Sequence, residues 1–276
     1  DHNLLKLDIL GHDDPTMIKA LEAYISSPAM ENEYNETDHP FVATDIPLDD
    51  QGVMSLFHDT SALGITPDDI GGCPVGCLGI PEFGTDFVIQ MVVDTKPQTL
   101  SDLIRISGLS HGTDVWLNNA QDLIRSGTVK LEEAISTRDD VMNYLIEHGV
   151  RPLTAFKVME NVRKGKGLEK GGSNNKAELD AAHVPQWFID SCLKIGYLFP
   201  RAHAVAYVMM AFRIAWFKVY QPLAYYAAYF TIRAEGSFNA PVILKGLESQ
   251  KAELARIAAL EHSTAVEKGN ATVIEV

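Results

Sequence analysis

The run from Tyr197 to Pro222 combines an apolar composition with positive charge and contains no Asp or Glu. Its aromatic and small alanine side chains are apolar enough for a buried helix, yet Arg201, His203 and Arg213 interrupt them. The whole chain carries a formal net charge of -14. A cationic, acid-free helix in such a chain needs a negatively charged partner, and phosphates are the obvious candidates.

The charge of the chain is unevenly distributed. Residues 1–100 have a net charge of -15, whereas residues 101–276 have a net charge of +1. Within the second part, residues 151–170 hold six Lys or Arg against two acids, and residues 191–234 hold five and no acid. Charges farther apart than a Debye length of about 10 Å are largely screened, so local patches decide what binds. The acidic total therefore does not exclude nucleic acid.

Composition favours a cytoplasmic protein with no membrane partner. The mean hydropathy is near zero, and the most apolar stretch, Ala202–Ala215, is shorter than the roughly 20 residues that a membrane span needs. The charged start, Asp1–Asp14, does not resemble a signal peptide, and the missing initiator Met suggests excision from something longer. Three cysteines suit a reducing compartment, and the spacing of Cys73 and Cys77 predicts no zinc site.

Periodicity predicts a mainly α-helical chain with a short β-strand at residues 4–11. Asp14 before Pro15 is typical of a helix N-cap and predicts a helix that ends near Tyr24. A Gly-rich, flexible connector is expected near residues 164–175. Further helices are predicted over 86–94, 99–107, 113–126, 130–135, 137–148, 151–163, 176–182, 185–196, 202–219, 222–234 and 247–261.

Asp8 lies in the middle of the apolar strand pattern. An unpaired buried carboxylate costs several kcal/mol, so Asp8 needs a partner. One interpretation is a strand-end residue that caps a turn or pairs with Lys6. The other is a metal-ligating carboxylate of the kind that two-metal phosphoryl transfer uses.

Three further groups each allow a structural and a functional interpretation. The basic segment Arg163, Lys164 and Lys166 is either a solvated helix end or a clamp for a triphosphate or a DNA backbone. Ser110 and His111 lie in a Gly-flanked turn that either packs and caps or contacts nucleic acid.

The third group starts the acid-free helix, where His203 and Tyr207 are four residues apart and share a face. They either fill a polar stripe of a core helix or form a nucleotide site. In that site Arg201 and His203 meet phosphates and Tyr207 offers a flat surface to a base or sugar.

Several long segments together resemble the bacterial family C replicative DNA polymerases, and among them the PolC type. The segments are 2–18, 78–88, 101–124, 162–168 and 197–235. The resemblance implies that residues 1–14 are a remnant of the palm and that residues 15–276 are the helical fingers domain. Asp8 is then the third palm carboxylate that binds catalytic Mg²⁺. The residues implied at the nucleotide or template are Arg163, Lys164, Lys166, Arg201, His203, Tyr207, Ser110 and His111.

The implied activity is DNA-directed DNA synthesis by Mg²⁺-dependent nucleotidyl transfer. The implied partners are the template-primer, a dNTP and the rest of the polymerase chain. A sliding clamp and other replisome proteins would bind through regions absent from this sequence. The upstream motif that supplies the first two catalytic aspartates is also absent, so the 276-residue chain alone is expected to be inactive. The alternatives are a non-enzymatic helical nucleic-acid-binding module and a helical interaction protein.

Overall fold

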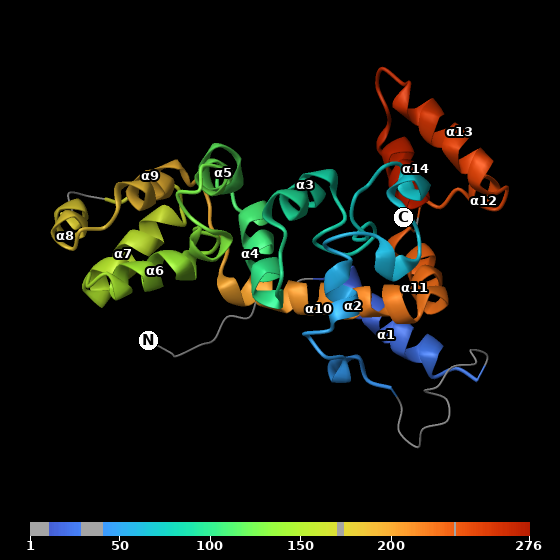
Figure 1. Ribbon diagram of the computed structural model, residues 1–276, viewed down its shortest axis with the longest axis horizontal. Helices are drawn as coiled ribbons and strands as arrows, with labels where there is room; N and C mark the ends of the chain where they lie inside the picture. Colours follow the sequence, from blue (N-terminus) through green and yellow to red (C-terminus); the bar gives the residue numbers. More distant parts are fainter. Residues whose placement is uncertain (1–10, 29–40, 170–173, 235) are drawn as a thin grey trace.

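The computed structural model describes residues 11–28, 41–169, 174–234 and 236–276. The chain forms an elongated, helical molecule in which α10 (Arg201–Tyr220) runs along one side and connects two groups of helices (Figure 1). One group holds α5 to α9, and the other holds α1, α2, α11 and the C-terminal helices. The described residues contain no β-strand, only an isolated antiparallel bridge between Thr113 and Tyr197. The prediction of a mainly α-helical chain is confirmed, whereas the predicted strand at 4–11 lies almost entirely outside the described residues.

The other helices follow the chain in order. They are α1 (Asp13–Ile25), α2 (Gln51–Ser55), α3 (Asp86–Thr95), α4 (Leu100–His111), α5 (Gln121–Arg125), α6 (Arg138–Glu147), α7 (Pro152–Val162), α8 (Asn175–Ala181), α9 (Gln186–Lys194), α11 (Pro222–Ala228), α12 (Ala240–Ile243), α13 (Leu247–Ala258) and α14 (Ala265–Glu275). Short 3-10 turns occur at Ala43–Asp45, Ser61–Leu63, Pro67–Ile70 and Leu131–Glu133, and π-type turns at Trp116–Ala120 and Tyr229–Arg233.

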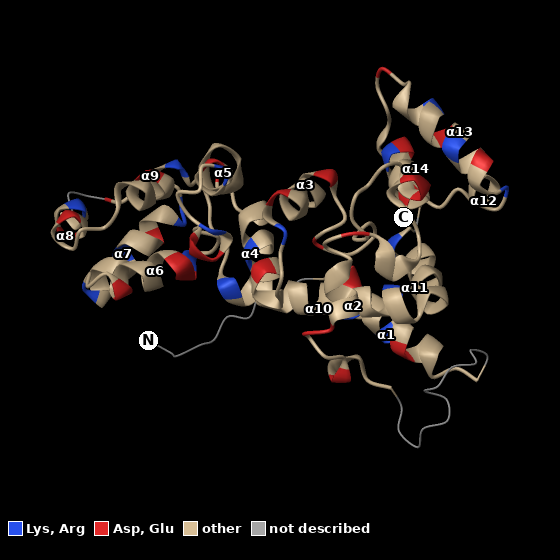
Figure 2. Cartoon of the chain, in the orientation of Figure 1, with Lys and Arg blue, Asp and Glu red and all other residues tan. Residues whose placement is uncertain are grey.

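Helix α10 is the element around which the core is built. It begins directly after Pro200 and ends before Pro222, the residue that starts α11. Its buried alanines, among them Ala204, Ala211 and Ala215, let other helices approach closely, and α1, α2, α4 and α11 all contact it. Figure 2 shows the ribbon of α10 with Lys or Arg colour at its start and no acidic colour, as its sequence requires.

By length and composition alone, α10 meets the requirements of a membrane span. It is longer than the apolar stretch Ala202–Ala215 on which the sequence-based expectation relied. Half of it is buried inside the protein, however, as in the core helix of a folded domain. Burial against neighbouring helices accounts for its apolar composition.

The predicted Gly-flanked turn at Ser110 and His111 is wrong, because α4 continues through His111. Gly108 lies inside α4, and its lack of a side chain lets the backbone of another segment pack closely against the helix. A Cβ atom at Gly108 would lie 2.7 Å from the carbonyl oxygen of Ser136. The glycine therefore serves a close backbone approach, and Ser110 and His111 form the last helical turn.

The predicted helix over 113–126 is wrong in its first half. Asn118 is left-handed with a φ of 57°, and only α5 is regularly helical. The Asn119 amide donates hydrogen bonds to the carbonyls of Asp114 (3.0 Å) and Ser191 (3.2 Å). The ammonium of Lys194 donates to the Asn118 carbonyl at 2.6 Å. These tertiary hydrogen bonds replace the helical ones.

The start of α1 and the C-terminal helix also differ from the prediction. The N-cap of α1 is His12, so Asp14 lies inside the helix rather than before it. Helix α14 was not predicted, because Gly269 weakens its helical pattern. Its start nevertheless carries a capping box between Thr264 and Glu267, whose side chains each accept a hydrogen bond from the other residue's amide.

Candidate functional site

A row of aromatic and imidazole rings lies along the start of α10. The Phe199 and His203 rings stack with centroids 5.1 Å apart, and the Tyr207 ring is 4.3 Å from His203. Tyr207 also meets His12, at the start of α1, edge to face at 4.7 Å. We call these four residues and Tyr197, whose ring is 5.1 Å from Phe199, the ring row. The structure therefore brings together His203 and Tyr207, as their spacing predicted.

The imidazole of His203 favours its neutral form. Burial lowers the pKa of His203 below its usual value. Glu82 opposes this shift, whereas His111 and His12 add to it. A histidine with a lowered pKa is mostly uncharged at neutral pH, so His203 suits stacking or a neutral hydrogen bond better than charge pairing with a phosphate.

Glu82 connects α4 to this row. One of its carboxylate oxygens accepts a hydrogen bond from the Ser107 hydroxyl (3.1 Å) and lies 3.2 Å from Nε2 of His111. Nδ1 of His111 lies 2.8 Å from both the Ser107 carbonyl and the Ser110 hydroxyl, and its ring meets Phe199 edge to face at 5.9 Å. His111 thus lies beside the ring row, and Ser110 contacts His111.

Glu82 itself adopts a φ of +70°, which is unfavourable for a residue with a side chain. Strain of this kind persists only where the surroundings hold the residue, and it is frequent at functional sites. Sequence patterns did not single out Glu82 or Ser107, because neither belongs to a motif with a fixed spacing.

Asp14 is fully buried at the base of the row. One carboxylate oxygen lies 3.4 Å from the Arg233 guanidinium. The other lies 3.2 Å from Nδ1 of His12, but that nitrogen accepts the hydrogen bond of the Asp14 amide. This oxygen consequently has no hydrogen-bond donor within the described ranges. Burial raises the pKa of Asp14, with Glu82 and Asp13 adding to the effect and His12 and Arg233 opposing it. The sequence-based role of Asp14 as an N-cap is wrong, because its side chain turns inward.

The predicted basic segment forms a turn after α7. Nη2 of Arg163 and Nζ of Lys164 bind the Glu160 carboxylate at 2.9 Å and 2.8 Å. Their hydrogen bonds lower the pKa of Glu160 to about 2. Lys166 follows in the same turn, with its amide bonded to the Asn161 carbonyl at 2.9 Å.

This turn lies against the segment that leads into α10. The Leu198 amide donates to the Arg163 carbonyl at 3.3 Å, so the basic turn touches the residues that carry the start of the ring row. Gly165 has a φ of 65°, and a Cβ atom there would lie 2.6 Å from the Gly196 carbonyl oxygen. A glycine is required for this close contact. The basic turn therefore lies next to the end of the ring row that holds Tyr197 and Phe199.

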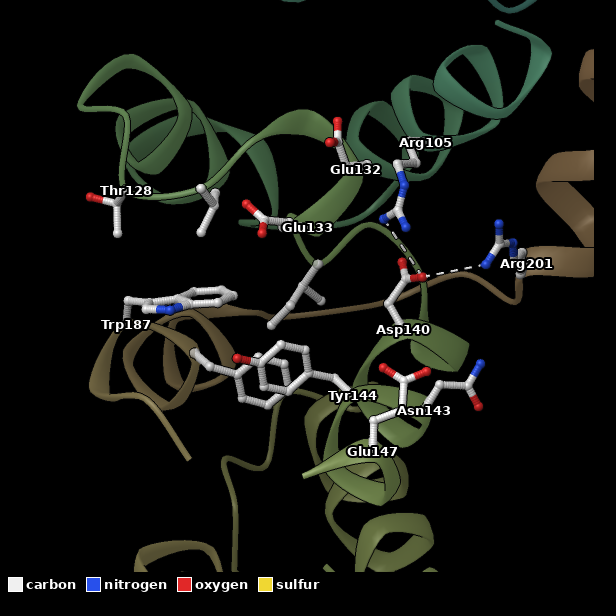
Figure 3. Close-up of a pocket in the computed structure, with 13 residues that line it drawn as sticks. Arg105, Thr128, Glu132, Glu133, Asp140, Asn143, Tyr144, Glu147, Trp187 and Arg201 are labelled. Carbon is white, nitrogen blue, oxygen red and sulfur yellow. Dashed lines mark ion pairs between the residues drawn. The ribbon is translucent and has the colours of Figure 1, made fainter. Parts of the chain in front are cut away.

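Arg201 points elsewhere, into a pocket of about 450 Å³ (Figure 3). Its guanidinium lies 3.8 Å from the Asp140 carboxylate, and Arg105 approaches the same oxygen at 3.7 Å. Two guanidinium groups thus share one carboxylate. Opposite them, Figure 3 shows Tyr144 and Trp187, and the Tyr144 ring stacks on Phe188 at 4.1 Å. The structure does not place Arg201 with His203 and Tyr207.

The described residues contain no group of three or more His, Cys, Asp or Glu side chains placed to hold a metal ion. Asp8, the residue expected to bind Mg²⁺, lies outside the described residues. The side chains that the structure describes do not by themselves fit a magnesium site.

A family model described as the bacterial DNA polymerase III alpha subunit finger domain matches residues 14–183. The chain belongs to this family and is mainly helical, and the five residues of the ring row lie outside the matched range. The chain is 54% identical over 274 residues to the DNA polymerase III PolC-type of Caldanaerobacter subterraneus subsp. tengcongensis, covering 99% of this chain and 18% of the relative. It is 51% identical to the DNA polymerase III PolC-type of Bacillus subtilis over 275 residues, with the same coverage. The PolC-type protein of Thermotoga maritima is 48% identical over 274 residues, covering 99% of this chain and 19% of the relative. The chain therefore spans about a fifth of the length of these relatives, and the resemblance to the PolC type is confirmed.

Proposed function

We propose that this fingers region binds the incoming dNTP and the template of a PolC-type replicative DNA polymerase, with the ring row as the nucleotide-facing surface. The observation that carries the proposal is the position of the row, between the Glu82 network and the basic turn of Arg163. Flat rings and flexible cations on adjoining surfaces match the two halves of a nucleotide, its base and its phosphates.

The row and the turn have different tasks in this proposal. Tyr207 and Phe199 offer ring faces to a base or sugar, and His203 offers an uncharged imidazole. Arg163, Lys164 and Lys166 meet the triphosphate or the template backbone. Glu160 pairs with Arg163 and Lys164. A bound phosphate would replace Glu160 as the negatively charged partner of these two cations.

Arg201 takes a separate place, because it lies in the pocket with Arg105 and Asp140. The two guanidinium groups share the pocket with four carboxylates, those of Asp140, Glu132, Glu133 and Glu147, so a phosphate would reach Arg201 only by replacing Asp140 as its partner. We therefore assign Arg201 to a phosphate outside the ring row, on the template or on the triphosphate tail.

The reaction of the complete enzyme is nucleotidyl transfer, in which the primer 3′-hydroxyl attacks the α-phosphate and pyrophosphate leaves. Mg²⁺ would supply charge stabilisation to this reaction. Because the described residues do not fit a magnesium site, we assign no step to them. Asp8 remains the proposed metal ligand, together with carboxylates outside this chain. The rest of the polymerase chain, the template-primer, a sliding clamp and other replisome proteins are the proposed partners, in the cytoplasm.

The test is steady-state kinetics of a full-length PolC-type polymerase that contains this segment. Loss of a stacking ring costs about 1–3 kcal/mol, so Tyr207→Ala should raise the KM for dNTP by about tenfold. Tyr220→Ala is the matched control, because Tyr220 lies at the far end of the same helix and bonds Asp50 instead. If Tyr207→Ala weakened template-primer affinity and left the KM for dNTP unchanged, the ring row would not be a nucleotide site. The alternative of a helical nucleic-acid-binding module would then be favoured.

A further inference from the structure

A second and larger cavity lies on the opposite side of the molecule from the pocket of Arg201. It is a groove of about 1100 Å³ between the loop at 68–78, α3 and the C-terminal pair α13 and α14. Small-molecule sites usually measure about 300–1,000 Å³, so this groove is large enough for a polypeptide segment.

The floor of the groove is apolar and comes from all three elements. Ile70 belongs to the loop, Ile89 and Val93 to α3, Leu254 to α13 and Ile274 to α14. Ile89 is buried, whereas the other four side chains are partly exposed although each is of a type that ordinarily packs in a core. A contiguous apolar surface of this kind is typical of a protein interaction site.

The rim of the groove is acidic. Asp68, Asp69, Asp86 and Glu275 line it, against the single cation Lys251. Among the residues that the structure describes, no ion pair involves any of these four carboxylates. Figure 2 shows the acidic colour at the start of α3, and α3 and α14 both line the groove.

Two of these carboxylates influence each other across the groove. Packing around the Glu275 carboxyl group raises its pKa, and the negative charge of Asp86 adds to the shift. The two like charges repel each other, and the salt bridges among the described residues include neither of them. A Lys or Arg side chain from a partner would relieve this repulsion.

We propose that the groove binds an amphipathic helical segment of a partner protein, whose apolar face covers Val93 and Leu254 and whose Lys or Arg side chains reach Asp68, Asp86 and Glu275. Helix-in-groove recognition of this type uses apolar anchors spaced by three or four residues. The acidic rim selects basic partners and repels nucleic acid, which separates this surface from the ring row. The proposal does not depend on the function proposed for the ring row.

The test uses two fluorescein-labelled synthetic peptides of about 15 residues and the 276-residue chain. Both peptides carry Leu at positions i, i+3, i+4 and i+7, and the remaining positions are Lys in one peptide and Glu in the other. Fluorescence anisotropy should show saturable binding of the Lys peptide and at least tenfold weaker binding of the Glu peptide. Equal binding of both peptides, or no saturable binding of the Lys peptide, overturns the proposal.

Three variants locate the binding surface. Asp68→Asn combined with Asp86→Asn should weaken the Lys peptide by about threefold to tenfold, because each exposed ion pair contributes about 0.2–1 kcal/mol. Lys251→Gln should strengthen binding, since it removes the one cation on the rim. Leu254→Gln tests the floor and should weaken both peptides. Binding that none of these changes affects overturns the assignment to this groove, and so does a dimer of the chain that excludes the peptide in sedimentation experiments.

Discussion

The ammonium group of Lys218 donates a hydrogen bond of 2.6 Å to the carbonyl oxygen of Leu78. A second bond, of 3.1 Å, reaches the carbonyl of Gly76. Lys218 lies in the last turn of the core helix α10 and is only 3% exposed. It therefore fastens the loop that leads to Glu82, which contacts His111 beside the ring row. A buried cation in the apolar helix has backbone carbonyls as its partners rather than phosphates.

Lys218→Met should destabilise the chain by about 2–4 kcal/mol. The substitution retains the volume of the side chain but leaves two buried carbonyl groups without their donor. Urea unfolding, followed by circular dichroism, measures the loss. The control is Lys157→Met, an exposed position on α7, which should change the free energy of unfolding by less than about 0.5 kcal/mol. Equal effects of the two substitutions would contradict the role of Lys218.

The stability of the chain should also depend on the ionisation of Lys218. Burial lowers the pKa of Lys218 to about 8, and the thiols of Cys77 and Cys73 oppose the shift. Above that pH the folded chain releases a proton that the unfolded chain retains, because lysine in an unfolded chain has a pKa of about 10.4. The contribution of Lys218 to stability therefore rises with pH.

The quantity to measure is the difference in unfolding free energy between the wild type and Lys218→Met. It isolates Lys218, since the buried thiols of Cys77 and Cys192 titrate in both proteins. Between about pH 7 and about pH 9 the difference should increase by about 1 kcal/mol in favour of the wild type. A difference that stays constant over this range would show that Lys218 does not titrate there.

Gly165→Ala should displace the basic turn and cost about 2–3 kcal/mol of stability. The new methyl group meets the Gly196 carbonyl oxygen, and the residue must also retain its left-handed φ. Gly127→Ala is the matched control, because Gly127 has a φ of 71° and open space around its Cβ position. It should cost only about 1 kcal/mol, the price of the backbone conformation. Thermal unfolding of both variants checks the difference.

Two substitutions at Glu82 separate its strain from its contacts. Glu82→Ala keeps the unfavourable φ and removes the bonds to Ser107 and His111, so it should cost about 1–2 kcal/mol. Glu82→Gly removes the same bonds but relieves the strain, and should be about 1 kcal/mol more stable than Glu82→Ala. Urea titrations measure both values. If Glu82→Gly were the less stable variant, the backbone at this position would not be strained.

The 276-residue chain by itself should not extend a primer. The resemblance implies that Asp8 is one of three catalytic carboxylates, and the other two belong to a motif that this sequence does not contain. A gel-based extension assay with template-primer, the four dNTPs and Mg²⁺ tests this prediction, with a full-length PolC-type polymerase as the positive control. Any product longer than the primer would show that the chain completes an active site.

Sequence alone determined most of the helices, the separation of charge along the chain and the family. Helical periodicity, proline positions and spacing are local properties, so α6, α7, α9, α10 and α13 lie within a few residues of their predicted ranges. The pairing of His203 with Tyr207 could be predicted for the same reason, because residues four apart share a helix face.

Tertiary structure alone decided which polar side chains meet. Glu82, Asp14 and Lys218 each bond a partner that lies 25 to 219 residues away in the sequence. Periodicity and motif spacing describe only residues that are close in sequence, so they could not predict these pairs. The same holds for Arg201, whose side chain enters the pocket of Asp140 although its neighbours His203 and Tyr207 join the ring row. Successive turns of a helix face different surroundings, and only the packing of the other helices determines whether a cation meets a carboxylate, a carbonyl or a ligand.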